Sequence, residues 1–196
     1  MVKNCRELPA HYRMVGSIQL KENKKLFILI NVFSILISVA LFFVGTAIVP
    51  LKVFFYVDRE HYWLRYGVML VGAIAYIVLH EAVHGIFMRL WGCGIKPTFG
   101  FGGVYAWAGS RAYFNRRCYL IIGLAPVVIW GVVLLIVGFL VPHAWFWVIY
   151  FIQIVNVSGA AGDFYVTARL MKAPDTLLVQ DDGVSMRLYL PENEEI

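Results

Sequence analysis

Long runs of mostly hydrophobic residues alternate with short polar segments along this chain. Four runs stand out, at residues 26–49, from about 62 to 90, at 119–141 and from 144 to about 170. Each is at least as long as the roughly 20 helical residues that cross a bilayer core of about 30 Å. The pattern predicts an all-α integral membrane protein with four transmembrane helices.

Two of the polar segments have features of their own. Residues 91–110 combine aromatic side chains with many glycines, which is too apolar for an ordinary loop and disfavours a helix. We expect a short hairpin at the membrane edge there, whose 99–107 stretch either offers a strand edge to an extended substrate or anchors aromatic rings at the interface. In the tail, Asp181-Asp182-Gly183 predicts a turn between extended pieces at 177–179 and 185–190.

These features divide the chain into a basic N-terminal arm (1–25), a four-span membrane domain (26–173) and a small polar C-terminal tail (174–196). Lysine and arginine concentrate in the arm, between the second and third runs, and after the fourth run. The connection between the third and fourth runs has none. Because cytoplasmic loops of membrane proteins are enriched in these residues, we expect both termini to lie in the cytoplasm.

Composition supports the membrane assignment and excludes another class of partner. Hydrophobic residues make up 61% of the chain and charged residues 15%, and a soluble core of this size could not bury so much apolar surface. The net charge of +5 comes from basic residues beside the apolar runs, where they face anionic lipid headgroups. We therefore expect the lipid bilayer as a partner and no nucleic acid.

The second run contains the motif His80-Glu81-Ala82-Val83-His84. On a helix, two histidines four residues apart project from one face and can bind one metal ion, and the glutamate between them can act on a metal-bound water. A chance match on a buried helix is the alternative. Ionisable groups within a membrane span cost about 2.5 to 3.5 kcal/mol each on insertion scales, so their presence there favours a functional site.

A catalytic zinc ion needs a third protein ligand, and Asp163 is the candidate because it is the only acidic residue in the fourth run. Counted from the outer ends of their runs, His80 and Asp163 lie at similar depths, about 24 Å and 28 Å at 1.5 Å per residue. Asp163 could instead pair with Arg169 or Lys172 at the end of the helix.

Asn156 lies about two helical turns before Asp163, roughly on the same face. Its amide could donate to a substrate carbonyl on which negative charge develops during hydrolysis. An interhelical hydrogen bond without a catalytic role is the other interpretation. The small residues between the two positions would let this helix approach the second one closely, or open it locally.

Together these motifs resemble the intramembrane site-2 protease group, and more narrowly a prokaryotic family described as putative zincin peptidases. The resemblance covers roughly residues 62–172 and is strongest at the 80–85 stretch, His-Glu-Ala-Val-His-Gly, with a weaker match at Gly123-Leu124-Ala125-Pro126. Asn156 and Asp163 match the family pattern imperfectly, because Ser-Gly-Ala-Ala-Gly replaces a proline-rich stretch and Phe164 replaces a glycine.

The resemblance implies a zinc endopeptidase of the prokaryotic cytoplasmic membrane that cleaves membrane-associated proteins or peptides. His80, His84 and Asp163 would then bind zinc, Glu81 would act as the general base on a zinc-bound water, and Asn156 would help to stabilise the oxyanion. The alternative is a non-catalytic membrane protein that keeps the metal site for regulation or partner binding. The intact glutamate and the count of three protein ligands favour the enzyme.

Overall fold

In the computed structural model, which describes residues 2–19, 23–102 and 106–194, helices occupy all four of the predicted runs. The first three are α1 (Lys24–Ile48), α3 (Tyr62–Trp91) and α4 (Arg116–Leu140), and the fourth run holds α5 (Phe146–Gly159) and α6 (Ala161–Met171). Three short helices lie in the connections between α1 and α3 and between α4 and α5: α2 (Lys52–Tyr56), η1 (Arg59–His61) and η2 (His143–Trp145). By length and composition, four helical segments of the described chain could cross a membrane.

The prediction of an all-α fold is wrong, because the chain also forms a five-stranded antiparallel sheet. The strands are β1 (Tyr12–Ile18), β2 (Thr98–Phe101), β3 (Ala106–Asn115), β4 (Leu178–Asp181) and β5 (Met186–Pro191), in the order β1-β5-β4-β3-β2. The expected hairpin between the second and third runs is β2–β3, and the expected extended pieces of the tail are β4 and β5. What the sequence pattern missed is that they join one sheet with the N-terminal arm.

The sheet could not be predicted from the sequence pattern because its strands pair with segments far away in the chain. In β1, Tyr12 pairs with Pro191 of β5, and Ser110 of β3 pairs with Asp181 of β4. Each segment alone reads as a short polar or aromatic connection, since a strand shows itself in sequence mainly through local alternation. The arm, the connection and the tail supply the strands, and none of the three could form this sheet alone.

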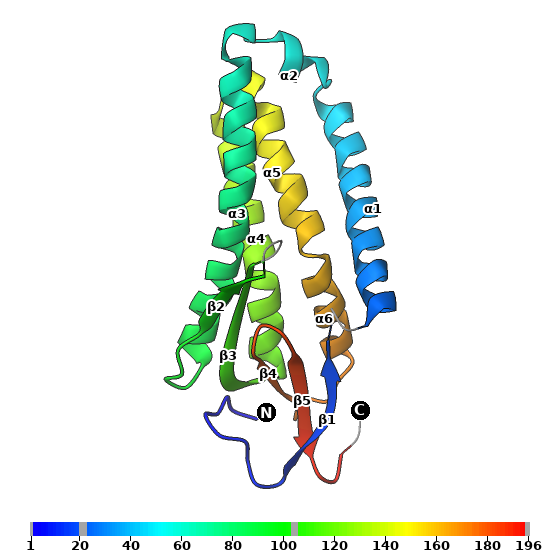
Figure 1. The fold of residues 1–196 in the computed structure, drawn as a ribbon, viewed down its shortest axis with the longest axis vertical. Helices are drawn as coiled ribbons and strands as arrows, with labels where there is room; N and C mark the ends of the chain where they lie inside the picture. Colours follow the sequence, from blue (N-terminus) through cyan, green and yellow to red (C-terminus); the bar gives the residue numbers. More distant parts are fainter. Residues whose placement is uncertain (1, 20–22, 103–105, 195–196) are drawn as a thin grey trace.

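Figure 1 shows the long helices side by side as an upright bundle, with the five strands gathered at its lower end. One face of the sheet packs against the ends of α3, α4 and α6. The apolar cluster there joins Phe114, Leu177 and Val179 from the sheet side to Met88 and Ile122 from the helices, all buried. The sheet is therefore fixed to the same helix ends that carry the predicted site.

The fourth run is interrupted near its middle. Gly159 ends α5, Ala160 leaves the helical conformation, and α6 starts at Ala161. The carbonyl of Ser158 accepts a hydrogen bond from the hydroxyl of Ser34 in α1, 2.8 Å away. The break places Asp163 in the first turn of α6, where the positive end of the helix dipole stabilises a carboxylate.

Candidate metal centre

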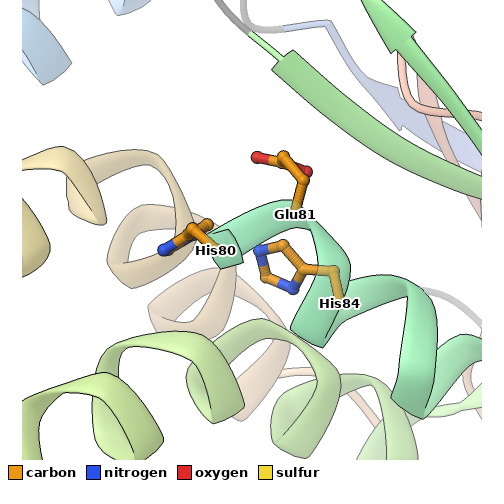
Figure 2. A group of neighbouring side chains, drawn as sticks. All are labelled: His80, Glu81 and His84. Atoms are coloured by element: carbon orange, nitrogen blue, oxygen red, sulfur yellow. The ribbon is translucent and has the colours of Figure 1, made fainter. Parts of the chain in front are cut away.

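The two motif histidines lie on the face of α3 that turns into the bundle. His80 and His84 are both buried, and their ring centroids are 4.9 Å apart. Their spacing of four residues places them one turn apart on the same face of the helix. Figure 2 shows the two imidazoles at successive turns and Glu81 between them, pointing away from the helix toward the neighbouring strands.

The carboxylate of Asp163 faces both imidazoles across the interface between α3 and α6. Its Oδ2 lies 3.3 Å from Nε2 of His80, and its Oδ1 lies 3.7 Å from Nε2 of His84. Within the described residues, Arg169 and Lys172 form no ion pair with it. The structure thus brings together the three side chains that the sequence proposed as ligands.

Hydrogen bonds on the far sides of the rings determine which nitrogens carry protons. Nδ1 of His84 lies 2.8 Å from the carbonyl oxygen of Ile122, which can only accept, so this nitrogen is the protonated one. When the ring is neutral, Nε2 carries a lone pair directed at Asp163. Such a partner behind the ring is typical of histidines that bind metals, because it fixes both the tautomer and the ring orientation.

His80 reaches the same state through two buried polar residues. The amide nitrogen of Asn156 donates to the carbonyl of Val127 at 3.2 Å, so its oxygen faces Tyr76 and accepts the phenolic proton at 2.8 Å. The phenolic oxygen, 2.6 Å from Nδ1 of His80, must then accept a proton from that nitrogen. In the neutral ring, Nε2 of His80 is again left with a lone pair.

The converging donor atoms fit a zinc ion. When both rings are neutral, two lone-pair nitrogens and a carboxylate face one another, and a metal ion between them removes the repulsion that this arrangement would otherwise have. Ligand atoms about 2.0 to 2.1 Å from a tetrahedral zinc lie about 3.3 to 3.4 Å apart. The distances of 3.3 and 3.7 Å between Asp163 and the two Nε2 atoms are close to that value. His80, His84 and Asp163 could therefore hold the ion and leave a fourth position for water.

Glu81 lies within the same group of potential donors. One ligand atom from each of His80, Glu81 and His84 lies within 4.8 Å of the others. Glu81 also accepts a backbone hydrogen bond from Ala108 in β3, which holds its carboxylate toward the sheet. Asp163 is the better third ligand because it faces both Nε2 atoms, which leaves the Glu81 carboxylate free beside the open position.

Asn156 is fully buried, and all its polar atoms have protein partners. Its nitrogen is 3.2 Å from the carbonyl of Val127 and 3.4 Å from the side-chain oxygen of Gln153. A direct role at the oxyanion stays a prediction. The side-chain oxygen of Asn156 instead accepts from the hydroxyl of Tyr76, which contacts His80.

A cavity of about 500 Å³ opens in front of the motif. Its lining includes the motif residues, Asp163, Tyr119 of α4, Trp107 of β3 and the turn between β4 and β5.

Sequence reasoning missed Tyr76, Tyr119 and Asp181. The hydroxyl of Tyr119 donates to Asp181, and burial raises the pKa of that carboxyl. The Asp-Gly step after Asp181 predicts a turn, and no feature of the local sequence distinguishes Asp181 from Asp182.

One of three comparisons with known proteins gives a match. A search among curated proteins and a search among solved structures give no match. A family model described as "Putative zincin peptidase" matches residues 73–178, more than half of the 196-residue chain. The matched range contains the motif, Asn156 and Asp163, and the name of the family implies a zinc-dependent peptidase. The chain belongs to the putative zincin peptidase family.

Proposed function

We propose that this protein is an intramembrane zinc endopeptidase, related to the site-2 proteases, that hydrolyses peptide bonds of membrane-associated proteins. The observation that carries the proposal is the approach of the Asp163 carboxylate to Nε2 of both motif histidines, 3.3 and 3.7 Å away. A structural zinc site usually has four protein ligands, whereas three protein ligands and an adjacent glutamate are typical of catalytic sites.

The residues divide the chemistry between them. When bound, zinc supplies Lewis acidity, which activates water and polarises the peptide carbonyl. Glu81 takes the proton of the attacking water on its carboxylate and later delivers a proton to the leaving amide nitrogen. The fixed tautomers of His80 and His84 keep the lone pairs of both rings directed at the ion.

The membrane setting of the proposal rests on composition. Four helical segments of the described chain are long and apolar enough to cross a bilayer. Side chains on α1, such as Phe33, Leu36 and Phe43, are widely exposed, as expected for a surface that faces lipid. We propose a location in the prokaryotic cytoplasmic membrane, with both termini in the cytoplasm and the sheet on that side.

The test compares the wild type with Glu81→Gln, both purified and reconstituted with single-span peptides. The glutamine has nearly the same shape but cannot take a proton, so both proteins should bind one zinc ion and only the wild type should release cleavage products. Glu60→Gln, in the connection between α1 and α3, is the matched control and should behave like the wild type. Equal cleavage by the wild type and Glu81→Gln, or no cleavage by either, would overturn the proposal.

A further inference from the structure

The cavity in front of the motif has a wall made by the C-terminal hairpin. Asp181 ends β4, and the turn from Asp182 to Ser185 connects it to β5. Asp181, Gly183 and Ser185 all line the cavity, together with Trp107 of β3. The turn is tightly seated there: a Cβ atom on Gly183 would lie 2.0 Å from the indole of Trp107. The tail is thus part of the site.

The two adjacent aspartates of this hairpin have different surroundings. Asp182 accepts hydrogen bonds from the backbone N–H groups of Val184 and Ser185, and it pairs with the guanidinium of Arg187 at 3.1 Å. Asp181 accepts from the hydroxyl of Tyr119 and from the N–H of Gly183. In the described part of the chain, no lysine or arginine pairs with Asp181.

Charge in the cavity is unbalanced toward the negative. Three carboxylates line it, from Glu81, Asp163 and Asp181, and no described lysine or arginine side chain does. A divalent ion at the histidines offsets two of these charges. The Asp181 carboxylate is partly buried and lines this cavity without a cationic partner among the described residues, so a lysine or arginine that reached it would gain a charge-assisted hydrogen bond.

Substrates of the proposed enzyme would bring such a partner. The cytoplasmic flanks of transmembrane segments are rich in lysine and arginine. The wall that carries Asp181 belongs to the sheet, which lies at the lower end of the bundle (Figure 1). In the orientation proposed above, the cytoplasmic flank of a substrate would emerge at this end. We propose that Asp181 is a specificity-determining residue that binds a lysine or arginine side chain on the cytoplasmic flank of the substrate. This inference rests on the proposed function.

The test uses the full chain in lipid nanodiscs and a set of single-span peptides. In the set, one lysine is moved residue by residue along the cytoplasmic flank, and each peptide has a counterpart with glutamine at that position. For the wild type, we expect kcat/KM to be about tenfold or more higher for the best lysine peptide than for its glutamine counterpart. In Asp181→Asn, which keeps an oxygen that can accept from Tyr119, the ratio should fall to about one. Asp182→Asn is the matched control and should keep the preference.

A measurement of peptide binding tests the role of Asp181 independently of proteolysis. In the Glu81→Gln background, the dissociation constant for the lysine peptide should be about tenfold lower than for the glutamine peptide, and Asp181→Asn should remove the difference. Equal binding of the two peptides, or a lysine preference that persists in Asp181→Asn, would overturn the role of Asp181. Absence of cleavage with the binding difference intact would refute the protease and leave the role of Asp181 standing.

Discussion

The phenolic oxygen of Tyr76 lies 2.6 Å from Nδ1 of His80, one turn further along α3. Both residues are buried, and the same hydroxyl donates to the side-chain oxygen of Asn156 at 2.8 Å. One phenol therefore connects the first motif histidine to α5. Because this contact fixes the tautomer and direction of the ring, Tyr76 is a positioning residue for the metal ligand rather than a ligand itself.

Replacing Tyr76 with phenylalanine should weaken zinc binding without unfolding the protein. The ring stays in the apolar interior, but His80 loses the acceptor that holds its Nδ1–H. Loss of such a partner typically lowers metal affinity by about 10- to 100-fold. The measurement is a competition titration with a chelator of known affinity, and Tyr66→Phe on the same helix, more exposed and away from the site, is the control. An unchanged zinc affinity in Tyr76→Phe would refute the positioning role.

A second prediction concerns the contact between β3 and the C-terminal hairpin. A Cβ atom on Gly109 would lie 2.3 Å from the backbone carbon of Asp182 and 2.5 Å from the nitrogen of Gly183. Backbone atoms cannot move aside as a side-chain tip can, so Gly109→Ala should lower the free energy of unfolding by about 1 to 3 kcal/mol. Thermal unfolding in detergent measures the effect. Gly16→Ala in β1, where nothing lies within 4 Å, should leave Tm nearly unchanged, and a similar Tm for the two variants would contradict the account.

The end of the bundle opposite the sheet depends on a buried arginine. Arg65 has no exposed surface, and its guanidinium donates to the carbonyls of Ala144, Phe54 and Asp58 at 2.9, 3.0 and 3.1 Å. It therefore joins η2 to the connection between α1 and α3. Arg65→Met would leave three carbonyl groups without this donor, at about 1 to 3 kcal/mol for each one that stays buried.

We expect Arg65→Met to lower Tm clearly, whereas Arg59→Met, at an exposed position nearby, should have little effect. The folded fraction of Arg65→Met should still bind zinc, since the site lies at the other end of α3. A variant that keeps the stability of the wild type would show that the three hydrogen bonds contribute little. Loss of zinc from the folded fraction would show that the two ends of the helix are coupled.

The helices could be predicted from the sequence because each is encoded locally, in an apolar run long enough to span a bilayer. The motif histidines and Asp163 could be found as well, since ionisable residues are conspicuous in such runs. The sheet could not, because β1 pairs with β5 across nearly the whole chain. The role of Tyr76 could not be predicted for a related reason, because it depends on a contact with Asn156, 80 positions away. A tyrosine in an apolar run also has no local feature that indicates a function.

The same limit applies to Asp181. Its neighbour Asp182 does what an aspartate in a turn usually does, accepting the N–H groups of Val184 and Ser185. Asp181 also accepts an N–H of the turn, from Gly183, but its second oxygen accepts from Tyr119 in α4. Asp181 lines the cavity only because the sheet packs against the helices, and this packing cannot be read from the local sequence.

X-ray absorption at the zinc edge of the purified protein tests most directly whether His80, His84 and Asp163 bind one zinc ion. We predict one zinc per chain, with two imidazole nitrogens and further oxygen ligands at about 2.0 to 2.2 Å and no sulfur. In Asp163→Ala, the affinity for zinc should fall strongly. Sulfur ligands in the wild type, or a wild-type spectrum retained at full affinity in Asp163→Ala, would contradict the account.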